Sequence, residues 1–339
     1  MNEKAVQILE QYDLTVLRTY TGRGAVMLET EEGTKTVKEF AGSRMILPYE
    51  QQLMQYLQRI GLCITDCIVP NREGELLSRD TDGIFYIVKD WPEGKACETK
   101  NREELIRAME LLAGFHQAAR GLWKITPEER HPRMYGTSVT EEYEKHNREL
   151  KKVRNFIRGR QKKGDFELLF LKEATYFLDM SQKAAEQLAE SAYKKLYNKA
   201  CEEGHICHGE YVHHNILYSR TQSSLINFQR CCIDIQIHDL YLFLRKIMEK
   251  HNWNRDLGTR MLEAYEQKLP LSGEEQAYLA LRLYYPEKIW KLANHYFHTN
   301  KAWIPEKSSE KLTIFLEQEE NRIRFLKDIF QTPKIPKNS

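Results

Sequence analysis

The chain has 339 residues, of which 51 are Lys or Arg and 49 are Asp or Glu, giving a formal net charge of +2 at pH 7. This length exceeds the usual size of a single domain, so we expect two lobes. The near balance of charge provides no overall attraction to nucleic acid or to an anionic membrane. The opening segment MNEKAVQILEQYDL lacks the features of a signal peptide, and no stretch approaches the roughly 20 apolar residues that span a bilayer. We therefore expect a folded protein without membrane insertion.

The first part of the chain is predicted to be rich in strands. VMLET (26–30) and KTVKEF (35–40) flank a turn and read as a hairpin, and the apolar spacing in 48–61 predicts a helix that ends at a glycine. A further strand, IFYIVKDW (84–91), stops before a proline. We expect residues 1–91 to form a small N-terminal lobe.

Helical spacing dominates the rest of the chain. Apolar residues recur at threes and fours in 102–121 and again through 141–203, which predicts amphipathic helices in a larger lobe over 92–330. Residues 331–339 are predicted to be a flexible tail. A basic run at 151–163 could contact an anionic partner, but a solvated face is the favoured interpretation. No aromatic stacking pattern accompanies these charges, so nucleic-acid binding is the weakest functional hypothesis.

The seven cysteines form an odd set without a CxxC pair, which favours reduced thiols over a disulfide framework or a zinc ribbon. The adjacent Cys231 and Cys232 lie in an apolar stretch, and we expect them to contribute to packing.

Residues 205–245 are the most informative part of the sequence. They contain, in chain order, His208, Gly209, Glu210, Asn215, Asn227 and Phe228. This layout resembles the catalytic core of the aminoglycoside-phosphotransferase superfamily, which has a loop HGDxxxxN, followed by two strands and a metal-binding Asp-Phe pair. The resemblance therefore implies a catalytic loop with two altered acidic positions, Glu210 and Asn227.

These two changes affect different parts of phosphoryl transfer, which requires one carboxylate to orient and deprotonate the acceptor and other groups to hold magnesium. Glu210 keeps the negative charge, but its extra methylene displaces the carboxylate by about 1 Å, and such a displacement can cost about 100-fold in rate. Asn227 replaces an anionic magnesium ligand by a neutral amide, which weakens the attraction to a hard cation. Asn215 is the metal ligand that remains.

The N-terminal lobe is expected to hold the nucleotide. Gly22 and Gly24 begin a phosphate-covering loop, although Met27 takes the place of the third glycine in GxGxxG. The strand order places Lys38 as the lysine that pairs with the phosphates, and Glu50 in the following helix as its ion-pair partner. The alternative interpretation is a surface lysine and a surface glutamate.

Within this superfamily, the chain resembles most specifically the CotS-type spore coat proteins of endospore-forming bacteria. This resemblance covers roughly residues 5–330. Its further marks are DWPEGKACE, LAGFHQAARG, HHNIL and IHDLYLFLRKIMEKHNW. The resemblance implies an α+β, bilobal, protein-kinase-like fold and a role in assembling or modifying the coat. It also implies synthesis in the mother-cell cytoplasm, later residence in the coat, and coat proteins or a small-molecule acceptor as partners.

Two main functional hypotheses follow. In the first, the chain is a pseudokinase or a strongly impaired phosphotransferase that acts by binding a partner. In the second, it is an active phosphotransferase that uses ATP or GTP with magnesium to phosphorylate a small hydroxyl compound, a sugar or a coat protein. Glu210 would then be the base, supported by His208, with Asn215 as the main metal ligand.

Other polar residues near the loop have alternative interpretations. Asp239 looks like the structural aspartate that binds the catalytic-loop backbone, whereas Asp234 is expected to stabilise a turn or, alternatively, to rescue metal binding. Five histidines could also form a zinc or copper site. They are His205, His208, His213, His214 and His238. The catalytic-loop interpretation explains them better.

Overall fold

The computed structural model describes residues 7–22, 24–298 and 305–330, which fall into two compact units. The first unit combines Met1–Tyr135 with Glu203–Leu240, and the second combines Gly136–Glu202 with Tyr241–Ser339. These units are not the lobes expected from the sequence, because the catalytic-loop segment groups with the N-terminal strands. The lobe boundary after residue 91 remains a prediction.

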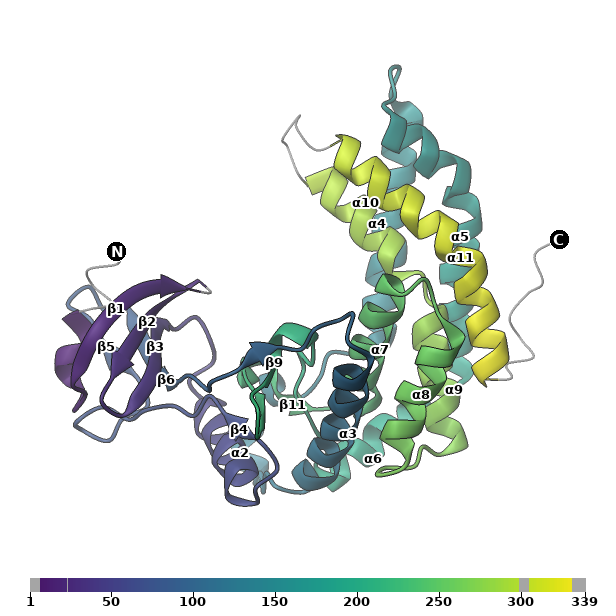
Figure 1. Ribbon diagram of the computed structural model, residues 1–339. Coiled ribbons are helices and arrows are strands. Elements are labelled where there is room, and N and C mark those ends of the chain that lie inside the picture. The colour runs from purple at the N-terminus through teal and green to yellow at the C-terminus, as the bar shows by residue number, and fades with distance from the viewer. Residues whose placement is uncertain (1–6, 23, 299–304, 331–339) are drawn as a thin grey trace. The chain divides into compact units, whose positions relative to one another are not determined.

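The first unit begins with a five-stranded antiparallel sheet in the order β1-β2-β3-β6-β5 (Figure 1). Its strands are β1 (Val16–Gly22), β2 (Ala25–Thr30), β3 (Gly33–Glu39), β5 (Ser78–Arg79) and β6 (Phe85–Asp90). The 3-10 helix η1 (Ile8–Gln11) packs on this sheet, where Ile8 and Tyr12 join buried residues of β2, β3 and β6. Alternating apolar side chains thus build the core on one face of the sheet.

The helix α2 (Leu47–Arg59) follows β3, as the apolar spacing predicts. Pro48 lies in its first turn, where no intrahelical donor is lost, and Leu53, Met54 and Leu57 are fully buried. Gly61, with φ of +69°, follows its end. The helix places Glu50 on the buried side, which matters for the site described below.

A second sheet links the N-terminal strands to the catalytic-loop segment. Its order is β4-β10-β9-β7, and β4 pairs in parallel with β10. The strands are β4 (Ile64–Thr65), β7 (Lys95–Ala96), β9 (Ile216–Tyr218) and β10 (Ser223–Leu225). A two-stranded ladder of β8 (Ile206–Cys207) and β11 (Cys232–Ile233) and the helix α3 (Arg102–Ala119) belong to the same unit.

All seven cysteines lie in the described part of the chain and are free thiols. Cys231 is buried, and Cys232 is a ladder partner of Cys207, so the adjacent pair contributes to packing as expected. Burial raises the pKa of the Cys63 thiol to about 12, which keeps it protonated and unreactive at neutral pH.

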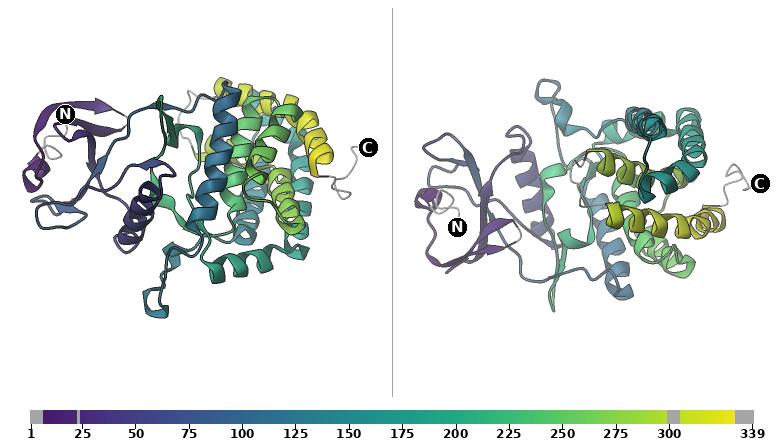
Figure 2. Two further views of the ribbon diagram at one scale, coloured as in Figure 1. Left: turned by 60° about the horizontal axis from the view of Figure 1, so that its bottom comes forward. Right: turned by 90° about the horizontal axis from the view of Figure 1, so that it is seen from above.

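The second unit is helical. Its elements are α4 (Val139–Gly159), α5 (Asp165–Glu190), α6 (Tyr193–Glu203), the part of α7 (Ile237–Lys250) from Tyr241 onward, α8 (Arg255–Glu266), α9 (Gly273–Tyr284), α10 (Glu287–His298) and α11 (Pro305–Phe330). The long helices α4, α5, α10 and α11 pack against one another (Figures 1 and 2). Among the described residues, no helix combines the length and apolarity needed to cross a bilayer.

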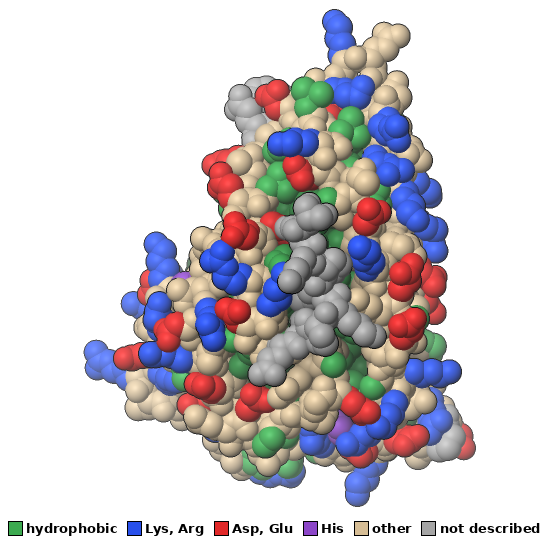
Figure 3. Space-filling view, turned by 90° about the vertical axis from the view of Figure 1, so that its right-hand side faces the viewer, with side chains coloured by type: hydrophobic (Ala, Val, Ile, Leu, Met, Phe, Trp, Pro, Cys, Tyr) green, Lys and Arg blue, Asp and Glu red, His purple; other side chains and the backbone are tan. Residues whose placement is uncertain are grey.

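The basic run at 151–163 covers the end of α4 and the loop before α5. Most of its Lys and Arg side chains are exposed, while Val153 and Ile157 of α4 point inward. Figure 3 shows Lys and Arg gathered along the upper edge of this unit, with Asp and Glu interspersed below. This arrangement is that of a solvated helix face.

Candidate active site

Asp239, at the start of α7, binds the backbone of the catalytic-loop segment. Its two carboxylate oxygens accept hydrogen bonds from the backbone N–H of His208 (2.6 Å) and Gly209 (2.9 Å), and one also lies 3.3 Å from Nε2 of His116. Burial would raise the pKa of Asp239, but the hydrogen bond with His116 outweighs it and lowers this pKa. The predicted structural role of Asp239 is confirmed.

Gly209 allows the loop to turn sharply at this point. Its φ is +76°, and a Cβ at this position would overlap the carbonyl oxygen of Arg230. Only glycine satisfies both conditions.

His208 is a fully buried member of the loop. Its Nε2 lies 3.0 Å from the carbonyl oxygen of Ile226, and its Nδ1 accepts from the backbone N–H of Glu210 at 3.2 Å. These two bonds require a neutral ring with the proton on Nε2, and burial lowers the pKa of His208 in agreement. His208 therefore positions the backbone of Glu210.

The side chain of Glu210 reaches the surface of this unit. It is 40% exposed, and its carboxylate lies 3.8 Å from Nε of Arg230. Its backbone carbonyl accepts a hydrogen bond from Nδ2 of Asn215 at 2.9 Å. The carboxylate is accessible to an acceptor molecule, beside one arginine.

The two residues expected to bind metal contact each other. Nδ2 of Asn227 donates to Oδ1 of Asn215 at 2.8 Å, and Asn227 has the left-handed backbone conformation, with φ of 68°. One of the two lone pairs of the amide oxygen that Asn215 would offer to a metal ion is thus engaged. An aspartate at position 227 could not make this bond, because its ionised carboxylate has no proton to donate.

Asp66, which follows β4, is a carboxylate of the site that the sequence analysis did not identify. Both of its oxygens lie 3.1 Å from the backbone N–H of Asn227, and Oδ2 also lies 3.2 Å from Nζ of Lys89 in β6. Nζ of Lys89 also forms an ion pair with Oε1 of Glu50 at 2.9 Å. The three side chains Glu50, Asp66 and Lys89 are buried and form one ion-paired group, here called the Lys89 triad.

The Lys89 triad corrects one expectation. We expected Glu50 to pair with Lys38, but its ion-pair partner among the described residues is Lys89. Burial alone would lower the pKa of Lys89, whereas the charges of Asp66 and Glu50 raise it, so Lys89 is protonated. A lysine directly after the apolar run FYIV (85–88), in the same strand, was the sequence signal for this residue, because a lysine is almost never fully buried unless it is paired.

Lys38 lies on the same sheet face as Lys89. Thr36 of β3 pairs with Lys89 of β6, and Lys38 is two residues further along β3, where side chains return to the same face. Burial and the neighbouring charge of Lys89 lower the pKa of Lys38, while Asp66, Glu50 and Glu210 oppose this. Lys38 is therefore a cation near the triad whose charge is less fully compensated than that of Lys89.

A cavity of about 320 Å³ lies within the first unit, in the size range of small-molecule sites. Its lining residues are Ala25, Met27, Thr36, Lys38, Asp66, Lys89, Trp91, Ala96, His214, Asn215 and Asn227. It thus brings Lys38 together with Asn215 and Asn227. Gly22 and Gly24 stand at the β1–β2 turn, next to the lining residue Ala25.

The remaining polar residues behave as structural groups. Oδ1 of Asp234 accepts from the backbone N–H of Ile235 at 2.7 Å, which fits the expected role in a turn. His205 lies 2.7 Å from Glu203, and the His213 and His214 rings meet edge to face. Within the described residues, these histidines form no three-residue metal-ligand cluster.

Solved structures share this fold over almost the whole chain. An aminoglycoside phosphotransferase from Alicyclobacillus acidocaldarius superposes with a TM-score of 0.83, covering 96% of this chain and 95% of that one at 18% identity. An amicoumacin kinase in complex with AMP-PNP, Ca²⁺ and amicoumacin gives a TM-score of 0.62 over 96% and 94% at 14% identity. At such low identities these likenesses show the fold alone.

The β-sheet region, the helical remainder and the loop around His208 define a protein with the kinase-like fold of the aminoglycoside phosphotransferases. Residues 5–329 match the family model described as "Spore coat putative kinase YutH", and the chain belongs to this family. Spore coat protein S of Bacillus subtilis (strain 168) is 24% identical over 310 residues, which are 90% of this chain and 86% of that protein. The resemblance inferred from the sequence is thereby confirmed.

Proposed function

We propose that the chain is a kinase-like spore coat protein whose metal-dependent phosphoryl transfer is absent or strongly impaired. The observation that carries this proposal is the hydrogen bond between Asn227 and Asn215. It joins the two expected metal ligands to each other, and both are neutral amides without the negative charge that a hard cation favours.

The charges around the cavity support the same conclusion. Lys38 and Lys89 contribute two positive charges, and Glu50 and Asp66 contribute two negative charges, so these four groups are neutral together. A divalent cation therefore meets no excess of negative charge there, although hard cations favour anionic oxygen ligands. An incoming magnesium ion would also have to compete with Lys89 for Asp66.

ATP or GTP remains the proposed ligand of the cavity. Lys38 would pair with the phosphates, and the backbone at Gly22 and Gly24 would approach them. Glu50 would contribute indirectly, through its ion pair with Lys89. Lys38 is suited to this role because no ion pair of its own is found among the described residues, and because a cavity opens beside it. Magnesium, if bound, would be carried mainly by the nucleotide phosphates and by Asn215.

An active phosphotransferase is the second candidate, and Asp66 is the observation that favours it. Its carboxylate lies 3.1 Å from the backbone of Asn227, so it could supply the negative charge that the amide lacks. Glu210, being 40% exposed, would then serve as the base. The two candidates differ in whether Asp66 stays with Lys89 or turns to a metal ion.

The coat role follows from the family and from the relative Spore coat protein S. We propose that the protein is made in the mother-cell cytoplasm and becomes part of the coat. Its partners would be coat proteins or a small hydroxyl-bearing acceptor.

Thermal unfolding with ATP or GTP, each with and without Mg²⁺ or Mn²⁺, tests this proposal. We expect stabilisation by nucleotide that depends little on the metal and is lost in Lys38→Ala. Lys35→Ala is the matched control, because Lys35 lies in the same strand but pairs with Asp90. Metal-dependent stabilisation together with ATP hydrolysis would favour the active enzyme instead.

A further inference from the structure

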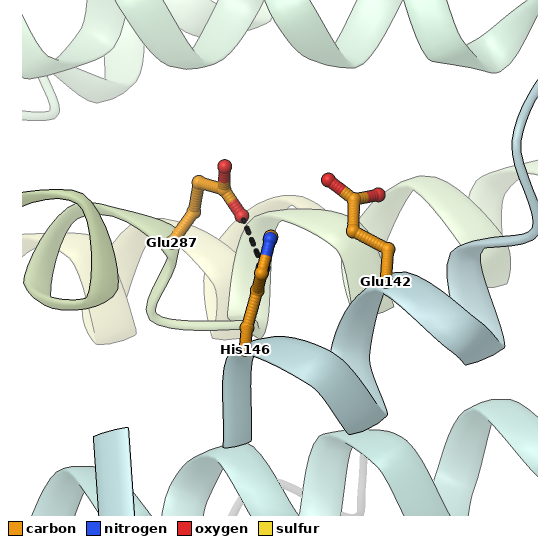
Figure 4. Close-up of side chains that lie close together, drawn as sticks. All are labelled: Glu142, His146 and Glu287. Atoms are coloured by element: carbon orange, nitrogen blue, oxygen red, sulfur yellow. Dashed lines mark ion pairs between the residues drawn. The ribbon is translucent and has the colours of Figure 1, made fainter. Parts of the chain in front are cut away.

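The second unit contains a separate cluster of potential metal ligands, remote in sequence from the catalytic loop. Glu142 and His146 lie one turn apart on α4, and Glu287 begins α10 (Figure 4). One ligand atom from each residue can be chosen so that all three lie within 4.8 Å of one another. Among the described residues, this is the one group of three or more His, Cys, Asp or Glu side chains with that property.

His146 brings a buried ring nitrogen without a hydrogen-bond partner to the two carboxylates of this cluster. Its side chain is 5% exposed, and its Nδ1 has no hydrogen-bond partner among the described residues. Nδ1 points toward Glu287, 3.7 Å from Oε2, which is too long for a hydrogen bond (Figure 4). A buried ring nitrogen without a partner costs free energy unless another group satisfies it.

The ring of His146 is held in one orientation. It is stacked on Trp290, with the ring centroids 3.3 Å apart, so its plane is fixed.

Nearby cations leave the inner oxygens of the cluster accessible. Lys291 pairs with Oε1 of Glu287 at 3.0 Å, whereas the atom that faces His146 is Oε2. Arg282 is 3.8 Å from Glu142, beyond hydrogen-bond distance. A third cation, Arg245, also acts on both carboxylates, but it is paired with Glu249. All three cations can therefore stay in place while the cluster takes up another ion.

The geometry points to a divalent transition-metal site, of the kind that binds zinc, formed by Glu142, His146 and Glu287. One imidazole nitrogen and two carboxylate oxygens are a zinc donor set, and three protein ligands leave a fourth position for water. Donors at about 2.0–2.1 Å in a tetrahedron are about 3.4 Å apart, so the 3.7 Å separation closes with a small side-chain movement. Such an ion would tie α4 to α10.

Calorimetric titration of untagged, nucleotide-free protein with Zn²⁺ tests this inference, and Co²⁺ provides a spectroscopic probe. We expect one ion per chain and a rise in the melting temperature. Glu142→Gln and Glu287→Gln should each weaken binding by about tenfold or more, because even supporting residues around metal sites contribute that much. Glu144→Gln is the matched control, since Glu144 is on the same helix and its side chain is 60% exposed.

Circular dichroism of every variant establishes that it is folded. Glu142, whose side chain is 30% exposed, is the least buried of the three proposed ligands. Bound Co²⁺ should absorb in the visible range without the charge-transfer band of a thiolate ligand. The inference is overturned if the folded wild-type protein binds no stoichiometric Zn²⁺. It is equally overturned if Glu144→Gln weakens binding as much as Glu142→Gln, or if a thiolate band places the ion on cysteines.

Discussion

Replacing Asn227 by Asp tests the central argument about the catalytic loop. The wild-type amide donates to Oδ1 of Asn215 at 2.8 Å. An aspartate would instead place two oxygens face to face, at a position where Asp66 already contacts the backbone. Without metal, Asn227→Asp should therefore be less stable than the wild-type protein, whereas with magnesium the new carboxylate should become a ligand.

The expected cost can be estimated from the lost hydrogen bond. Leaving a buried polar group without its partner costs about 1–3 kcal/mol. The same carboxylate should make stability depend on magnesium, and an ion at ten times its dissociation constant stabilises the folded state by about 1.4 kcal/mol. The two effects have opposite signs, so a magnesium series separates them.

The assay is urea unfolding across a magnesium series for four proteins: wild type, Asn227→Asp, Glu210→Asp and the double variant. Glu210→Asp serves as the matched control, because it shortens a carboxylate that is 40% exposed and leaves the contact between Asn215 and Asn227 intact. ATP hydrolysis is measured alongside. Effects within one transition state need not add, so all four proteins are required.

We expect Asn227→Asp to gain more from magnesium than Glu210→Asp does, and the double variant to recover the most hydrolysis. Equal magnesium responses in the two single variants would contradict the role assigned to position 227. Wild-type hydrolysis at an ordinary kinase rate of about 1 s⁻¹ or faster would refute the pseudokinase proposal itself.

Three further predictions concern stability, each measured by urea unfolding. Lys89→Met leaves two buried carboxylates without their cation and should lower the free energy of unfolding by about 3–5 kcal/mol. Lys35→Met removes a cation whose partner Asp90 is 40% exposed, so its effect should be clearly smaller. Equal losses of stability in the two variants would contradict the buried character of the triad. Gly209→Ala should destabilise the protein far more than Gly61→Ala does, because Gly61 has a similar positive φ but open space where a Cβ would lie. A similar loss of stability in the two variants would show that the loop can move away from Arg230. Burial lowers the pKa of His116 and of His208, so both side chains stay neutral in the folded state. Their contribution to stability should therefore be present above pH 6.5 and decrease below it, because the unfolded chain takes up protons there. An unchanged urea midpoint between pH 7.5 and 5.5 would contradict this prediction.

The catalytic loop could be predicted from the sequence because its function depends on local spacing. His208, Glu210 and Asn215 lie within eight residues, and Asn227 follows after one short hairpin. The structural role of Asp239 was also predictable, because the family resemblance implies it, and in the structure Asp239 satisfies two loop N–H groups.

The ion pair above the loop could not be predicted in the same way. Lys38 and Lys89 share one face of the sheet, so the register between β3 and β6 and the position of α2 decide which lysine reaches Glu50. Sequence spacing determines the face of a strand but not this register. Asp66 was missed for a related reason, because its contact with Asn227 joins residues 161 positions apart.

The parallel pairing of β4 with β10 has a consequence for biosynthesis. Residues 64–65 find their strand partners only at 224–225, after the whole segment Gly136–Glu202 of the other unit has been made. A ribosome-bound chain that ends before residue 223 would therefore carry β4 without its strand partner β10. The unit that holds the cavity is therefore completed late in translation, because the lining residues Asn215 and Asn227 also follow that segment in the chain.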